Sequence, residues 1–220
     1  MGRFQVKKQD TFIDMTPMSD VMVLLLTFFM LTATFTKEEP VAVNVPGSVS
    51  EIKIPETNIL TIFVDKDGKA FMCFDNPERQ KKLIVEMNKR YTNLHFTEEQ
   101  IKDFANAPTF GTPLNITQAW IKLDPAERNA VLTGKVANIK NGIPCDEETI
   151  TDATRGGKKI SELAAWVDMA REDNVGGKDM RIAIKADKNT PYKSVKDVMN
   201  ALRSINENRY NLITTLKNGD

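Results

Sequence analysis

The stretch MTPMSDVMVLLLTFFMLTATFT, at residues 15–36, decides the fold of this chain. Asp20 is its only charged residue. At ~1.5 Å of rise per residue, a helix of this length measures ~33 Å and matches a bilayer core of ~30 Å. No other part of the sequence is comparably apolar. We therefore predict a single transmembrane helix at residues 14–36, followed by a water-exposed domain.

Asp20 allows two interpretations. Thr16 and Pro17 are typical of a helix start, so Asp20 lies near the N-terminal end of the predicted span. There it could simply be an acid favoured by the helix dipole and headgroup water. Alternatively, it exchanges protons while packed among partner helices, because an ionised carboxylate in hydrocarbon costs ~2.5–3.5 kcal/mol and burial favours the neutral form.

A polar stripe along the predicted span favours the second interpretation. Asp20, Thr27 and Thr34 recur every seven residues and therefore share one face of a helix. Hydroxyl groups in an apolar medium usually mark a contact with another helix. We expect Thr16 and Pro17 to start the helix, Thr27 and Thr34 to pack against partner helices, and Asp20 to carry protons.

The flanks of the span predict its orientation. The short tail at residues 1–13 contains Arg3, Lys7 and Lys8, which favours a cytoplasmic N-terminus and export of everything after the span. A cleaved signal peptide is the alternative, but the uncharged run is long for one and residues 32–34 make a poor cleavage site. Three prolines at residues 37–58 predict an extended linker.

Composition excludes several functions. The 220 residues hold 30 basic and 30 acidic side chains without a cationic block, so nothing predicts nucleic-acid binding. Cys73 and Cys145 could form one disulfide in an oxidising compartment, or could be two free buried thiols. The single histidine, His95, predicts no metal site. With neither a catalytic triad pattern nor a phosphate-binding loop, we expect no enzyme and no cofactor.

Residues 59–220 predict one α+β domain. Strands at 59–64 and 69–74 flank the turn sequence Asp-Lys-Asp-Gly and form a hairpin. Later, a helix at 158–172, a strand at 180–186, a helix at 194–205 and a strand at 210–216 favour a small mixed sheet with helices on one face. Between these parts, residues 92–157 look like a largely helical insertion, either an added docking surface or inert decoration.

Two stretches together resemble the ExbD/TolR family. Residues 12–31, FIDMTPMSDVMVLLLTFFML, look like the family's N-terminal span, in which Asn-x-Thr-Pro precedes one Asp and an apolar run. Residues 182–215, IAIKADKNTPYKSVKDVMNALRSINENRYNLITT, look like its C-terminal β-α-β unit with an Ala-Asp-Lys turn. With the hairpin, the resemblance covers about half of the chain.

The resemblance implies a motor subunit of the Gram-negative inner membrane, driven by the proton-motive force. Such a subunit usually lies as a homodimer inside a ring of ExbB- or TolQ-like polytopic proteins, and its periplasmic domain energises a TonB-like partner for outer-membrane transport. The family's proton-carrying Asp falls on Asp20, and its Thr-Pro on Thr16 and Pro17. Asp14 replaces the family's Asn and could be a proton uptake group or a charge anchor.

Two other functions remain open at the level of sequence. A TolR-like subunit would maintain the cell envelope instead of energising transport. A membrane-tethered periplasmic binding module would use residues 14–36 only as an anchor, and would then tolerate replacement of Asp20. Neither the residues nor the resemblance separates Ton from Tol duty.

Overall fold

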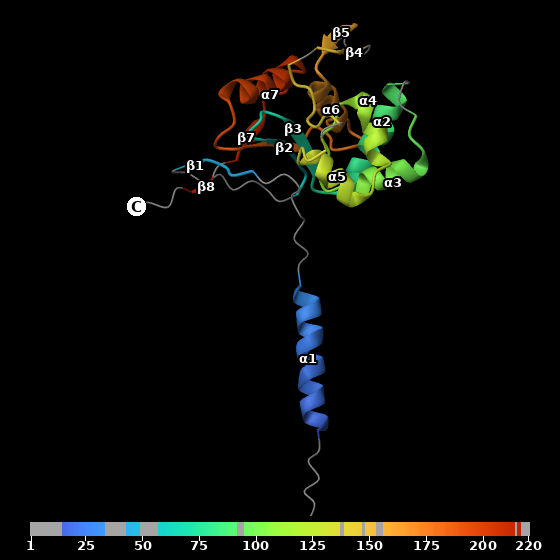
Figure 1. Ribbon diagram of the computed structural model, residues 1–220, viewed down its shortest axis with the longest axis vertical. Helices are drawn as coiled ribbons and strands as arrows, with labels where there is room; N and C mark the ends of the chain where they lie inside the picture. Colours follow the sequence, from blue (N-terminus) through green and yellow to red (C-terminus); the bar gives the residue numbers. More distant parts are fainter. Residues whose placement is uncertain are drawn as a thin grey trace, which may run out of the picture. The chain divides into compact units, whose positions relative to one another are not determined.

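The computed structural model describes residues 15–33, 43–48, 57–91, 95–136, 139–146, 148–152, 156–213 and 215–216. The chain divides into two units, Met1–Lys37 and Glu38–Asp220, and each is described by itself. The first contains helix α1 (Thr16–Thr32). The second contains every other helix and strand that the structure describes (Figure 1).

The second unit is built on a four-stranded mixed sheet. Strands β2 (Ile59–Val64) and β3 (Ala70–Phe74) form the expected antiparallel hairpin. At its turn, Gly68 has a φ of 78° and donates its N–H to the carbonyl oxygen of Asp65 over 2.8 Å. Strand β6 (Arg181–Ala186) runs parallel to β2, and β7 (Tyr210–Leu212) runs parallel to β6. The order β3-β2-β6-β7 confirms the mixed sheet.

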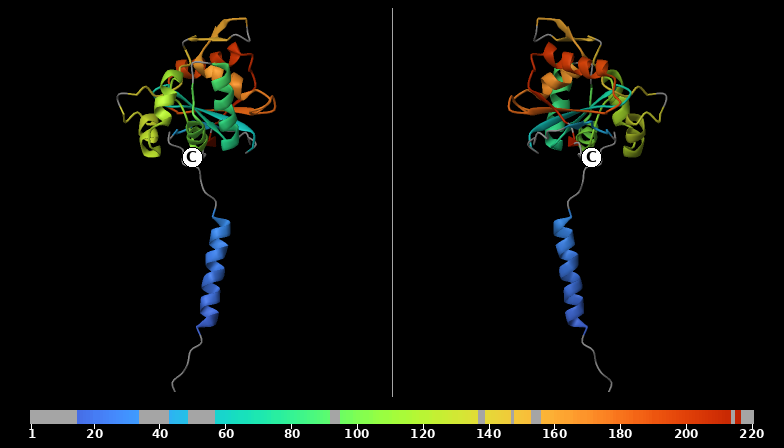
Figure 2. Two further views of the ribbon diagram at one scale, coloured as in Figure 1. Left: turned by 90° about the vertical axis from the view of Figure 1, so that its right-hand side faces the viewer. Right: turned by 90° about the vertical axis from the view of Figure 1, so that its left-hand side faces the viewer.

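Helices α2 (Pro77–Arg90), α6 (Glu162–Ala170) and α7 (Tyr192–Ser204) lie together on one side of this sheet (Figures 1 and 2). Their apolar stripes meet the sheet, as amphipathic spacing requires. At the N-terminus of α2, the side chain of Asn76 accepts a hydrogen bond from the N–H of Glu78. The residues on the inner side of these helices and of the strands form one core.

One predicted element is wrong. Residues 158–172 do not form a continuous helix, because Lys158–Ile160 is strand β5 and pairs with β4 (Ile150–Asp152). Ser161 ends the strand and caps α6 by accepting a hydrogen bond from the N–H of Ala164. The hairpin β4–β5 projects from the domain in Figures 1 and 2. Both strands have only three residues, which is too short to give a recognisable strand pattern in the sequence.

The inserted segment belongs to the same core as the sheet. Its helices are α3 (Glu98–Asn106), α4 (Leu114–Ile121) and α5 (Pro125–Leu132). Phe104 and Phe110 pack on Trp166 of α6, with ring centroids 6.1 and 5.2 Å from the indole. Burying such aromatic surfaces is strongly stabilising. The insertion therefore completes the domain.

Two bridges from the insertion cover the outer edge of β3. Phe110 pairs with Met72, and Ile143 pairs with Ala70. On α2, the buried amide of Gln80 donates hydrogen bonds to the carbonyl oxygens of Phe104 and Ala107, over 2.7 and 2.9 Å. An uncovered strand edge invites pairing with other chains, and the insertion closes this one.

The last predicted strand, at residues 210–216, is divided in two. Its first part is β7. Its second part, β8 (Thr215–Leu216), pairs in parallel with β1 (Gly47–Ser48), which belongs to the predicted linker at 37–58, called the connector from here on. Just before β1, the main chain of Asn44 is held at the turn after β6: its N–H donates to Asp187 Oδ2 and its carbonyl oxygen accepts from the N–H of Lys188, both over 2.8 Å. Of the predicted linker at 37–58, residues 37–42 and 49–56 lie outside the described residues.

Candidate functional site

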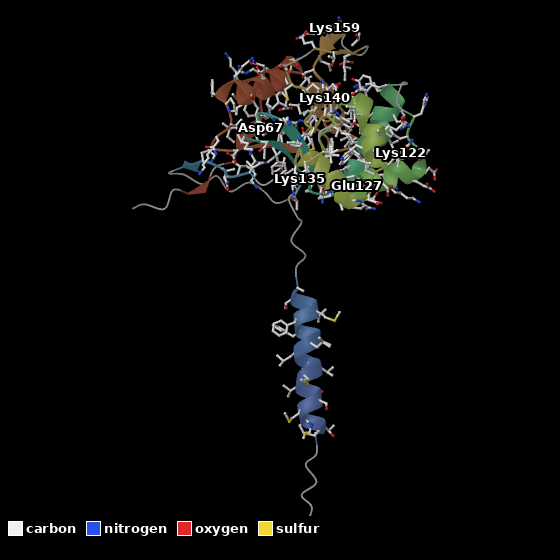
Figure 3. All side chains as sticks on the ribbon, in the orientation of Figure 1. Asp67, Lys122, Glu127, Lys135, Lys140 and Lys159 are labelled. Atoms are coloured by element: carbon white, nitrogen blue, oxygen red, sulfur yellow. The ribbon has the colours of Figure 1, made fainter. Side chains whose placement is uncertain are left out.

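Helix α1 carries exposed apolar side chains around its whole circumference. It begins after Met15 with Pro17 in its first turn, as the sequence predicts, and ends at Thr32. None of its side chains is buried, and Leu31 is 87% exposed. Figure 3 shows these side chains projecting on all sides of the helix. A helix of this kind has no inward face to pack within its own chain.

The predicted membrane span is longer than α1. Residues 14 and 34–36 of that prediction lie outside the described residues, and α1 contains 17 residues. Within the described residues, no helix combines the length and the apolar character needed to cross a membrane.

Asp20 lies on the second turn of α1, with an exposed side chain. Its carboxylate has no hydrogen-bond or ion-pair partner among the described residues. It is also the only charged residue of this helix.

The hydroxyl groups of α1 are satisfied within the helix. Thr27 Oγ1 donates to the carbonyl oxygens of Val23 and Leu24, each over 3.0 Å. Ser19 and Thr32 bond in the same way to Met15 and Phe28. Such bonds to the preceding turn remove the need for an external hydrogen-bond partner. A contact between Thr27 and another helix therefore remains a proposal, and Asp14 and Thr34 lie outside the described residues.

In the domain, Asp187 is a residue whose role the sequence pattern alone did not predict. Its carboxylate accepts hydrogen bonds from the N–H groups of Asn189 and Asn44, which hold its pKa below the ordinary value, and Lys188 and Lys66 act in the same direction. Asp187 thereby joins the connector to the turn after β6. A bond between residues 143 positions apart cannot be found from local spacing.

Neither cysteine forms a disulfide: Cys73 and Cys145 are both free, which settles the pairing left open by the sequence. Among the described residues, no group of three or more His, Cys, Asp or Glu side chains has the arrangement of a metal site. The feature most relevant to function is therefore a lone acid on an apolar helix that is joined to an α+β domain.

Comparison with known families decides how this arrangement is classified. The family model for "Biopolymer transport protein ExbD/TolR" matches residues 7–217, nearly the whole chain. The chain belongs to the ExbD/TolR family. This family comprises transport subunits rather than classical enzymes, and its members associate in general with ExbB- or TolQ-type and TonB- or TolA-type proteins.

A curated relative gives the same classification. The chain is similar to the "Biopolymer transport protein exbD2" of Vibrio cholerae serotype O1, with 30% identity over 73 residues. The match covers 30% of this chain and 54% of the relative, so the chain spans about half the length of that protein. No solved structure matches the chain.

Proposed function

We propose that this ExbD/TolR-family chain is a subunit of an inner-membrane motor in a Gram-negative bacterium, with Asp20 as its proton-carrying residue. Residues 14–36 form the span, residues 1–13 lie in the cytoplasm and residues 37–220 lie in the periplasm. One observation supports this proposal above the others: the single charged residue of a helix rich in exposed apolar side chains has no partner among the described residues.

The proposed cycle follows from the charge of Asp20. When protonated, the side chain is neutral and can face an apolar wall; when ionised, it needs water or a polar site. The transmembrane potential supplies ~2.3 kcal/mol per charge per 100 mV. If protons enter and leave Asp20 at different rotational positions of surrounding ExbB- or TolQ-like subunits, each proton drives one directional step.

The other residues of α1 have supporting roles in this proposal. Thr16 and Pro17 start the helix, and Thr27 and Thr34 lie on the face that meets partner helices. Asp14 either receives protons at the cytoplasmic surface or anchors the helix there. The chain acts as a homodimer within the ring, and its domain energises a TonB-like partner for outer-membrane transport.

The test compares Asp20→Asn with Ser19→Ala. The first variant removes the proton site with little change in size; the second changes the neighbouring residue, whose hydroxyl donates to the carbonyl oxygen of Met15. We expect both variants to co-purify with a polytopic ring subunit from membranes. Asp20→Asn should lose transport that depends on the proton gradient, and Ser19→Ala should retain it. Normal gradient-driven transport by Asp20→Asn would contradict the proposal.

A TolR-like duty is equally compatible with the family. The two duties differ in the phenotype of a deletion strain: loss of energised uptake indicates Ton duty, and loss of envelope integrity indicates Tol duty. A further strain distinguishes the motor from a tethered binding module. In this strain, a plain Leu-rich helix replaces residues 14–36. The motor fails with that replacement, whereas a tethered module keeps its function.

A further inference from the structure

A hollow in the described part of the domain lies beside the turn of the β2–β3 hairpin. Its volume is about 790 Å³. Its walls include Gly68 and Lys69 of that turn, residues 139–146 after α5, and Ser194 and Asp197 on α7. Sites for small ligands commonly measure ~300–1,000 Å³. The insertion and the sheet-forming part of the domain thus build this cavity together.

The wall formed by residues 139–146 is held in place by hydrogen bonds at Asn141 and Gly142. Lys69 Nζ donates to Asn141 Oδ1 over 2.6 Å, and Asn141 Nδ2 donates to the carbonyl oxygen of Leu132 over 3.1 Å. The N–H of Gly142 donates to the carbonyl oxygen of Gly111 over 2.7 Å. A binding site whose wall is preorganised in this way loses less conformational entropy when a ligand binds.

Gly142 allows this wall to approach the hairpin. Its φ is 90°, and a Cβ added there would lie 2.8 Å from the Cβ of Lys69. Only glycine tolerates both the backbone conformation and this close approach. The cavity therefore depends on a specific backbone path rather than on loosely packed loops.

Charges of opposite sign line different parts of the cavity. Lys140 belongs to the wall that contains Asn141, and Lys69 reaches Asn141 from the hairpin turn (Lys140 is labelled in Figure 3). Asp146 and Asp197 both lie near the thiol of Cys145, where they add to the effect of burial that raises the pKa of this thiol to about 12.

Three of these charged groups are available to a ligand. Lys140, Asp146 and Asp197 have no hydrogen-bond or ion-pair partner among the described residues. Val136 and Ile139 add apolar surface to the same hollow. The lining thus offers two carboxylates, one ammonium group without a partner among the described residues, and a small apolar wall. With Lys69, whose ammonium group is bonded to Asn141, the formal charges of the lining sum to zero.

We propose that this cavity binds a short peptide that carries both a free ammonium and a free carboxylate group. The ligand's ammonium group lies by Asp146 and Asp197, its carboxylate lies by Lys140 and Lys69, and its carbon atoms contact Val136 and Ile139. This binding activity is separate from the proposed proton transfer at Asp20.

The test measures binding of three probes to the full chain in detergent micelles by titration calorimetry. Trialanine carries both charges, trialanine amide only the ammonium group, and N-acetyl-trialanine only the carboxylate. We expect saturable binding of trialanine and at least about tenfold weaker binding of each blocked probe, which corresponds to about 1.4 kcal/mol. Equal affinity for all three probes, or no saturable binding of trialanine, would overturn the proposal.

Substitutions test which side chains contact the ammonium group and the carboxylate of the peptide. Asp197→Asn should weaken trialanine and trialanine amide but leave N-acetyl-trialanine unchanged, and Lys140→Gln should weaken trialanine and N-acetyl-trialanine alone. Asp67→Asn and Lys159→Gln are matched controls, because both residues lie outside the lining (Figure 3). The Asp20→Asn chain should bind trialanine normally, so failure of the motor proposal leaves this result interpretable.

Discussion

Helices α1 and α7 differ in the burial of their apolar residues. In α7, Val198, Ala201 and Leu202 turn towards the core, and Leu202 is completely buried. In α1, the apolar residues surround the whole helix and none is buried. A helix that is apolar all round is stable only when something else covers it. The contrast is consistent with the proposed function, in which membrane and partner helices surround α1, whereas α7 packs within its own domain.

The largest expected effect is on the core that α7 and α6 share with the insertion. Trp166→Ala removes a fully buried indole packed on Phe104 and Phe110. The free energy of unfolding of the domain should fall by about 3–5 kcal/mol. Urea unfolding of the full chain in micelles, followed by circular dichroism, measures this. A fall below about 1 kcal/mol would contradict the integration of the insertion into the core.

The second prediction applies one substitution to both helices. Leu202→Ala in α7 should lower the free energy of unfolding by about 2–5 kcal/mol, because Leu202 is 0% exposed. Leu31→Ala in α1 should leave domain unfolding unchanged, because Leu31 is 87% exposed and lies outside the core of the domain. The same urea titration compares them, and equal losses would remove the distinction between the two helices.

A smaller effect is expected where α2 holds the insertion. Gln80→Ala leaves the carbonyl oxygens of Phe104 and Ala107 without their buried amide donor. We expect a loss of about 1–3 kcal/mol in the free energy of unfolding. Glu78→Ala, on an exposed part of the same helix, is the control and should cost less. Equal stability of the two variants would contradict a stabilising role for the hydrogen bonds between Gln80 and the insertion.

The smallest effect concerns the connector and depends on pH. Since the folded-state pKa of Asp187 is lowered, its stabilising bonds are present above the unfolded-state pKa and are lost as the pH falls through the folded-state value. Hydrogen exchange at the amide of Asn44 should therefore accelerate relative to the core of β6 under acidic conditions. In Asp187→Ala the amide should be unprotected at all pH values. Persistent protection in that variant would contradict the assigned bond.

Much of the fold could be predicted because its cues are local. The hairpin around Gly68 and the cap at Asn76 depend on neighbouring residues, and the structure confirms both. The predicted helix at 158–172 was wrong at its start, because its helical spacing hid the fact that Lys158–Ile160 pairs with a strand; Glu162–Ala170 is helix α6.

The functional features also differ in whether their sequence cues are local or depend on residues far apart in the chain. Asp20 could be selected from the sequence because a lone acid in an apolar run is locally visible. The bond between Asp187 and Asn44, and the cavity that Lys140 shares with Asp197, join residues far apart in the chain. Only the tertiary structure brings them together, so sequence spacing could not predict them.

The most direct measurement of the central claim is the chemical reactivity of Asp20 in native membranes. A hydrophobic carbodiimide reacts with protonated carboxyl groups that are reachable from an apolar phase, and mass spectrometry then locates the adduct. The account predicts an adduct on Asp20, with loss of gradient-driven transport in proportion to its yield. An unmodified Asp20 under conditions that block transport would contradict the account, because the acid would then lie ionised in water and α1 would be an anchor alone.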